Sequence, residues 1–100
     1  MHFLLIYDVA TDYVQRRAAH RVAHLAHAQA AVDRGELVLG GAAGDPPDSA
    51  VLLFQADDDG PARRFAECDP YVLEGVVTSW TVKPWTTVVG ATASHRVPLR

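Results

Sequence analysis

The sequence predicts an α+β domain with four antiparallel strands and two helices in the order βαββαβ. Segments rich in apolar and β-branched residues recur four times, over residues 2–8, 36–40, 49–55 and 76–82. A long stretch without glycine or proline follows the first segment, and a shorter helical pattern follows the third. This order is the split βαβ, or ferredoxin-like, arrangement, which places both helices on one face of a four-stranded sheet.

The first segment, His2–Asp8, is apolar on both of its faces. One face carries Phe3, Leu5 and Tyr7, and the other carries Leu4 and Ile6. A strand with two apolar faces is buried on both sides. Since two helices cover only one face of the sheet, we expect a second copy of the chain to cover the other. The sequence therefore predicts a C2 homodimer that pairs sheet against sheet.

The long stretch predicts a single helix from about Asp12 to Arg34, which Asp12 can cap and Gly35 can end. On a helical wheel one side collects Val14, Ala18, Val22, Leu25, Gln29 and Val32, and we expect this side to be buried. His20, His24 and His27 gather on another side, with Arg17 and Arg21 near its edge. The helix is therefore predicted to bury one face and to present imidazole and guanidinium groups, which can transfer protons or bind anions, on another.

The remaining elements follow from turn and helix signals. Residues 40–48 are dense in glycine and proline and predict the loop of a hairpin between the second and third strands. Asp57–Pro61 can start a short helix over 62–68, which must stop at Asp69 because the residue before a proline is driven out of the helical region. We expect a domain over residues 1–85 and a weakly patterned tail over 86–100.

Composition narrows the class of protein. The chain has 100 residues, which suits one domain, and its net charge of −3 disfavours nucleic acid as a partner. Cys68 is the only cysteine, so an internal disulfide is excluded, and we expect its thiol to be buried and inert. No apolar run approaches the roughly 20 residues that span a bilayer, and the N-terminus lacks the pattern of a signal peptide. We therefore expect a cytoplasmic protein without membrane contact.

Three ordered motifs resemble the YciI-like (YCII-related) family. The first is Arg21–Leu25, an R-x-x-H-L helix motif, which continues into a G-x-L and Gly-Gly pattern over residues 35–41. The second is Asp69–Tyr71, a D-P-Y motif followed by Gly75, and the third is Val82–Trp85, which closes the last strand. Together the motifs cover the chain to about residue 85.

The resemblance implies a ferredoxin-like dimer akin to the dimeric α+β barrels. It also implies a catalytic pair, in which the histidine of R-x-x-H-L is His24 and the aspartate of D-P-Y is Asp69. The chemistry proposed within the family is proton transfer of the lyase or isomerase kind on small organic acids, without a cofactor.

The residues themselves support this pair but leave it open. Imidazole titrates near neutral pH, so it can accept and return a proton, and a carboxylate on one ring nitrogen fixes the tautomer. Without the resemblance, His24 can equally be a packed or solvated helix residue, and Asp69 a turn residue before proline.

Neighbouring side chains add candidates for substrate binding. Arg17 and Arg21 can bind a substrate carboxylate, or they can pair with acids such as Asp12 or Asp33. Tyr71 can supply a hydroxyl or simply pack. A metal bound by His20, His24 and His27 is the less favoured alternative, because three ligands on one straight helix rarely converge.

The leading hypothesis is therefore a small cofactor-independent enzyme. His24 acts as general acid and base, Asp69 orients it, and Arg21, Tyr71 and Arg17 bind a small organic anion. The alternative is a non-catalytic dimeric ligand-binding or accessory protein with the same pocket.

Overall fold

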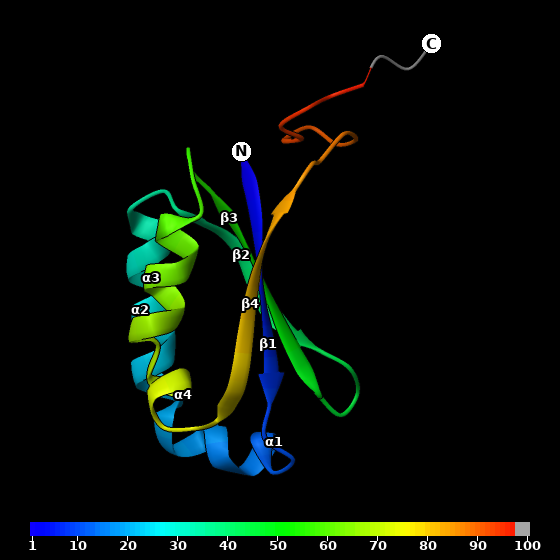
Figure 1. Ribbon diagram of the computed structural model, residues 1–100. Coiled ribbons are helices and arrows are strands. Elements are labelled where there is room, and N and C mark those ends of the chain that lie inside the picture. The colour runs from blue at the N-terminus through cyan, green and yellow to red at the C-terminus, as the bar shows by residue number, and fades with distance from the viewer. Residues whose placement is uncertain (98–100) are drawn as a thin grey trace.

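A computed structural model describes residues 1–97 and shows the expected order of strands and helices (Figure 1). The elements are β1 (His2–Val9), α1 (Tyr13–Arg16), the 3-10 turn η1 (Arg17–His20), α2 (Arg21–Asp33), β2 (Leu37–Ala43), β3 (Ser49–Gln55), α3 (Gly60–Cys68), α4 (Pro70–Leu73) and β4 (Val77–Trp85). The sheet order is β2-β3-β1-β4, and all neighbouring strands are antiparallel. The predicted ferredoxin-like fold is confirmed.

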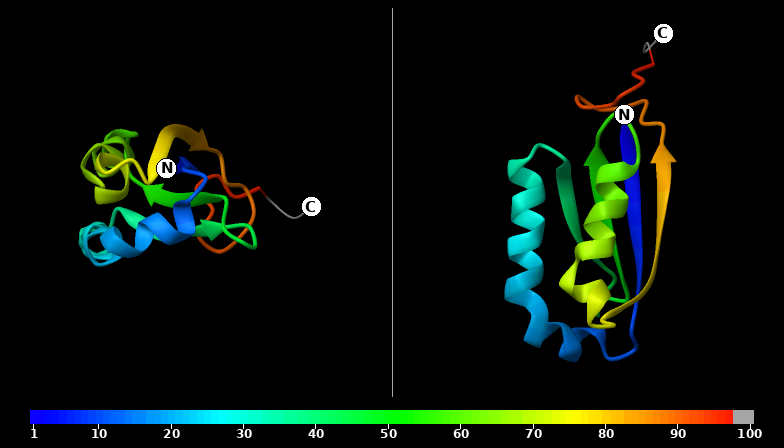
Figure 2. Two further views of the ribbon diagram at one scale, coloured as in Figure 1. Left: turned by 90° about the horizontal axis from the view of Figure 1, so that it is seen from below. Right: turned by 60° about the vertical axis from the view of Figure 1, so that its left-hand side comes forward.

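The helices form one layer against one face of the sheet, as the two further views show (Figure 2). The register aligns Leu5 of β1 with Leu52 of β3 and with Val82 of β4. These side chains face the helices, together with Tyr7 and Phe54 on the same strands, and all but Val82 are buried. The core therefore lies between the sheet and the helices.

The opposite face of the sheet is open and partly apolar. Leu4 and Ile6 alternate with the core residues of β1 and are half-buried in the single chain. Four apolar residues of the other strands share this face by register: Leu39, Val51, Leu53 and Trp85. Leu39 is 70% exposed and Trp85 44% exposed. The first strand thus has two apolar faces, as its sequence indicates.

The prediction of one continuous helix, buried on its apolar side, is wrong in two respects. The segment is divided into α1, η1 and α2. Its start with Asp12 at the N-cap position and its end at Gly35, with φ of +78°, follow the prediction, but the Asp12 side chain makes no capping hydrogen bond. The face expected to be buried is largely exposed, since Val22 is 85% and Leu25 48% exposed.

The histidine side of α2 faces inward instead. Ala31 is the buried residue of this helix, and His24 and His27 are half-buried on the same side. Both rings stack on aromatic side chains from α3 and α4 and find polar partners there. A polar imidazole can be buried when it has a hydrogen-bond partner. The partners of His24 and His27 therefore explain why the histidine side of α2, and not its apolar side, packs against the protein.

Smaller differences concern the strands and Cys68. The second strand continues through residues 40–43, which were expected to form loop, and turns at Gly44 with φ of +97°. The last strand extends to Trp85, and Cys68 is exposed rather than buried. Beyond the last strand, the Thr87 hydroxyl lies 2.6 Å from Nδ1 of buried His2. Among the described residues, no helix has the length and apolar character needed to cross a membrane.

Candidate active site

Asp69 lies at the junction that proline forces between two helices. Its backbone is extended, with φ of −68° and ψ of 124°, so α3 ends at Cys68 and α4 begins at Pro70. The Asp69 carboxylate caps α4 by accepting a hydrogen bond from the Tyr71 backbone N–H at 3.0 Å. The residue is fully buried, with 0% of its surface exposed. The local sequence thus places a carboxylate inside the protein, beneath α2.

His24 reaches this carboxylate from α2. Its Nδ1 lies 2.8 Å from Asp69 Oδ1, and its side chain is 15% exposed. The imidazole also stacks on the Tyr71 ring, with centroids 3.8 Å apart and planes 3° from parallel. The hydrogen bond and the stacking together hold the ring in one orientation.

Tyr7 completes the group from the sheet. Its hydroxyl donates to Asp69 Oδ2 at 2.6 Å, across 62 residues of sequence. Burial raises the pKa of Tyr7 well above its ordinary value, and the negative charge of Asp69 adds to this. The phenol therefore stays protonated and remains a donor. Sequence reasoning placed Tyr7 in the core and missed this role; the one available signal was a polar hydroxyl on a face of β1 that is otherwise apolar.

The hydrogen bonds around Asp69 determine which histidine nitrogen is free. Oδ1 accepts from His24 and from the Tyr71 amide, and Oδ2 accepts from Tyr7. A carboxylate only accepts hydrogen bonds, so Nδ1–H of His24 is the donor to Oδ1. The other ring nitrogen, Nε2, then carries the lone pair, and no hydrogen bond joins it to another of residues 1–97. The arrangement leaves a base ready for a ligand.

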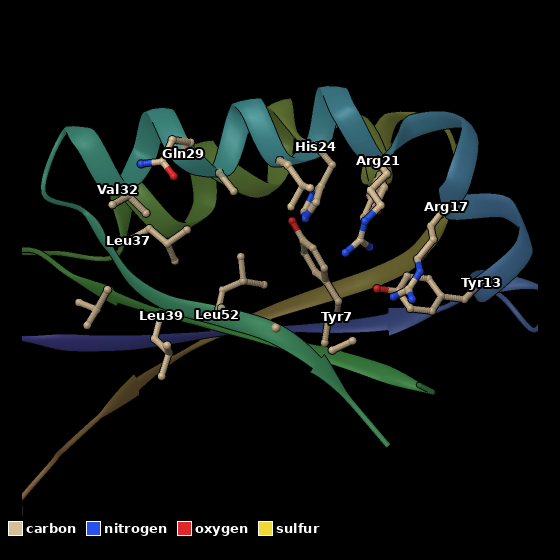
Figure 3. A pocket seen from close by; sticks show the side chains of 18 residues that line it. Tyr7, Tyr13, Arg17, Arg21, His24, Gln29, Val32, Leu37, Leu39 and Leu52 are labelled. Atoms are coloured by element: carbon tan, nitrogen blue, oxygen red, sulfur yellow. The ribbon is translucent and has the colours of Figure 1, made fainter. Parts of the chain in front are cut away.

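A pocket of about 600 Å³ opens beside His24, between α2 and strands β2 and β3 (Figure 3). Tyr7, Tyr13, Arg17, Arg21 and Tyr71 line it together with His24. All the residues that the sequence singled out for substrate binding therefore lie in one cavity. Asp69 lies behind His24 and Tyr71 and contacts the pocket through them.

The two arginines are available for a ligand. Asp12 pairs with Arg16 at 3.4 Å, and Asp33 accepts a hydrogen bond from Gln29. Within the described part of the chain, neither Arg17 nor Arg21 pairs with a carboxylate. The Arg17 guanidinium lies over the Tyr13 ring, 5.1 Å from its centroid. The alternative of ion pairs with Asp12 or Asp33 is therefore not what the structure shows.

The Tyr71 hydroxyl is a buried polar atom with no hydrogen-bond partner among residues 1–97. Burial raises its pKa, and the nearby Tyr13 raises it further. Arg21 opposes this rise in pKa by its positive charge and by its proximity as a hydrogen-bond donor, and the charge of Arg17 acts in the same direction. Arg21 is thus close to the hydroxyl, although the two do not form a hydrogen bond of good geometry among residues 1–97.

The other two histidines of the cluster have different surroundings. His27 Nε2 donates to the Phe65 backbone carbonyl at 2.9 Å, and its ring stacks on Phe65. His20 is half-buried and does not line the pocket. No three histidine, cysteine, aspartate or glutamate side chains converge as metal ligands within residues 1–97. His24, His27 and His20 therefore act as separate residues.

Comparisons with known proteins agree with this fold. Among solved structures, the chain resembles 5-chloro-2-hydroxyhydroquinone dehydrochlorinase (TftG) from Burkholderia phenoliruptrix AC1100, solved in complex with 2,5-dihydroxybenzoquinone. The TM-score is 0.71 at 22% sequence identity, over 87% of this chain and 95% of that one. A search of curated proteins found no matching relative. The model of the YCII-related domain matches residues 1–86, and the chain belongs to this family.

Proposed function

We propose that the chain is a small enzyme in which His24 moves a proton to and from a small organic anion. Asp69 and Tyr7 position the imidazole, and Arg21, Arg17 and Tyr71 bind the substrate. The observation that carries this proposal is the 2.8 Å hydrogen bond between Asp69 and His24 Nδ1, which leaves Nε2 without a partner among residues 1–97 at the wall of a pocket. Such a nitrogen can act as a general base near neutral pH.

The reaction begins when His24 Nε2 takes a proton from a carbon next to a carbonyl group. The electron pair of the broken C–H bond moves toward the carbonyl and forms an enolate. Arg21 and the unpartnered Tyr71 hydroxyl stabilise the negative oxygen. In an isomerisation, the imidazolium then returns the proton to another atom. In a lyase reaction, the enolate expels a leaving group with its bonding electron pair, and the imidazolium gives its proton to that group or to water. The side chains of the chain supply each step, so we propose that no cofactor is needed.

The structural neighbour TftG supports the lyase form of this proposal, in which the enolate expels a leaving group. Its name describes a dehydrochlorinase, and dehydrochlorination removes a proton together with chloride. A lyase reaction started by a general base is of the same type. The neighbour therefore favours the lyase reaction over the isomerase reaction.

We also propose that the enzyme is a homodimer joined through the open face of the sheet. Leu39, Val51 and Trp85 are each more than a third exposed on that face, beside half-buried Leu4 and Ile6. A second copy would bury them by C2 symmetry. The exposed thiol of Cys68 further favours a cytoplasmic location, because reducing compartments keep such thiols free.

Proton exchange in D2O tests the catalytic proposal without knowledge of the natural substrate. A panel of 2-oxo acids and cyclic enols is incubated with the protein, and loss of the carbon-bound proton is followed by NMR. We expect the parent to accelerate exchange for one chemical class, and His24→Ala to lower that rate by about 10²- to 10⁴-fold. His20→Ala is the matched control, since His20 lies on the neighbouring turn and outside the pocket.

Equal exchange rates for parent and His24→Ala would reject the catalytic role. If panel members bind to both proteins and neither accelerates exchange, the chain is a ligand-binding protein, which is the alternative function.

Sedimentation tests the homodimer. We expect the parent to sediment as a dimer and Val51→Lys to sediment as a monomer, because a lysine would be buried without a partner. Val22→Lys places the same charge on the exposed side of α2 and should stay dimeric. A monomeric parent would overturn this part of the proposal.

A further inference from the structure

The pocket beside His24 has two chemically different ends along α2 (Figure 3). Arg21 belongs to one end and Val32 to the other. Eleven residues separate them, which corresponds to about 16 Å along a helix axis. His24 lies one turn from Arg21, or about 4.5 Å along the axis. His24, the proposed general base, therefore lies near the end of the pocket that carries the arginines. Most of the pocket's length along α2 lies beyond His24, toward Val32.

The arginine end of the pocket has hydrogen-bond donors without acceptors among the described residues. No aspartate or glutamate lines the pocket, whereas Arg17 and Arg21 do, and neither arginine pairs with a carboxylate in the described residues. The Tyr71 hydroxyl is buried there without a hydrogen-bond partner in the part of the chain that the structure describes. Leaving a buried donor unpaired is unfavourable, so this end matches a ligand that brings negatively charged oxygen.

The other end is mainly apolar on both sides, although the polar side chain of Gln29, which donates to Asp33, also lines it (Figure 3). Leu25 and Val32 of α2 are 48% and 43% exposed, although they line the pocket, and half-buried Ala28 lies between them in sequence. Leu37 and Leu52 line the opposite wall from the sheet and are buried. Hydrocarbon placed between these walls would remove apolar surface from water on each side.

We propose that the substrate is an amphipathic monoanion, with a carboxylate or enolate oxygen at the arginines and an apolar extension of several carbons along α2. This inference rests on the proposed function for the reacting centre. Because His24 is one helical turn from Arg21, the carbon that loses its proton lies within a few bonds of the charged group. The extension then passes Leu25 and ends near Val32.

A series of straight-chain carboxylates from acetate to octanoate tests the inference by binding alone. We expect the dissociation constant, measured by calorimetry, to fall by about three- to fourfold for each added methylene beyond butyrate. The n-alcohols of equal length should bind about tenfold more weakly or worse, because they lack the charge that pairs with arginine. Affinity that is independent of chain length, or equal for acid and alcohol, would overturn the inference.

Two variants separate the ends of the pocket. Val32→Asp should abolish the dependence on chain length while leaving acetate binding unchanged, whereas Arg21→Gln should abolish the preference for acid over alcohol and keep the chain-length dependence. Val22→Asp is the matched control, because Val22 lies on α2 but does not line the pocket. Unchanged binding profiles in both pocket variants would show that the ligands bind elsewhere and would reject the inference.

The outcome is independent of catalysis, because the carboxylate series measures binding alone and proton exchange is measured in a separate assay. Loss of that dependence in a parent that still exchanges protons refutes only the inference. A retained dependence without any proton exchange refutes only the catalytic role.

Discussion

His24 and His27 lie three residues apart on α2 and have hydrogen-bond partners of different charge. Both rings are half-buried, both stack on an aromatic side chain, and both are hydrogen-bonded to the neighbouring segment that runs from α3 to α4. The partner of His24 is the carboxylate of Asp69, whereas the partner of His27 is the backbone carbonyl of Phe65. A carboxylate can stabilise the imidazolium that forms during proton transfer, whereas a neutral carbonyl does so much less.

The two residues also face different spaces. His24 lines the large pocket with the arginines, and His27 lines a smaller hollow of about 390 Å³ with Arg34, Glu36 and Cys68. Burial and stacking are therefore shared by a packing histidine and a candidate catalytic one. What separates them is a charged partner behind the ring and an accessible cavity in front of it.

Removing each histidine in turn should separate the two roles most clearly. We expect His24→Ala to lose about 10²- to 10⁴-fold in the exchange rate, while His27→Ala stays within about threefold of the parent. His27→Ala should instead lower the free energy of unfolding by about 1 kcal/mol or more, because its hydrogen bond and stacking are lost. Parallel exchange assays and urea unfolding of the two variants measure the contrast, and similar kinetic losses in both would contradict it.

Asp69→Asn tests the charged partner. The amide keeps the shape of the carboxylate but cannot stabilise an imidazolium, and its N–H₂ group can hold the ring in the other tautomer. We therefore expect a loss of about 10²-fold or more in the exchange rate, with His24 still present. Near-parental exchange by a folded Asp69→Asn protein would show that the carboxylate has no part in the reaction.

Much of this architecture could be predicted from the sequence, because each element carries its own local signal. Proline after Asp69 stops a helix whatever surrounds it, and alternation in His2–Asp8 gives a strand with two apolar faces. The inward side of α2 could not be predicted in this way, since a wheel of apolar residues ignores the buried partners of His24 and His27. Tyr7 was missed for a similar reason, because its partner is 62 residues away and depends on the packing of a strand beneath two helices.

Tyr7→Phe tests the second donor to Asp69. It removes the hydrogen bond from the Tyr7 hydroxyl and leaves the hydrogen bond between Asp69 and His24 intact. We expect the free energy of unfolding to fall by about 1–3 kcal/mol, because Asp69 Oδ2 is left buried with an unused lone pair. The exchange rate should fall less than in Asp69→Asn. Chemical denaturation measures the first effect, and a variant as stable as the parent would show that the hydrogen bond contributes nothing.

The smallest expected change is in the free energy of unfolding at alkaline pH. Below about pH 10, tyrosine is protonated in both the folded and the unfolded chain. Above it, the unfolded chain releases a proton that folded Tyr7 retains, because its pKa is raised, so the folded state binds more protons and stability falls as pH rises. Each such tyrosine adds up to about 1.4 kcal/mol of destabilisation per pH unit.

Tyr71 acts in the same direction, since its pKa is also raised. Unfolding measured at pH 9, 10 and 11 should therefore show a shallower decline for Tyr7→Phe than for the parent. An equal decline in both proteins would mean that Tyr7 does not retain its proton.

The Asp69 carboxylate joins three parts of the chain that are far apart in sequence, namely β1 through Tyr7, α2 through His24 and α4 through Tyr71. The bonds from Tyr7 and His24 span 62 and 45 residues of sequence, so they are lost when the chain unfolds, and the pocket exists only in the folded molecule. Any compound that occupies it shifts the folding equilibrium of the whole domain, by about 2.7 kcal/mol at a hundredfold excess over its dissociation constant. The melting temperature of the protein can therefore serve as the detector in a blind search for its natural ligand.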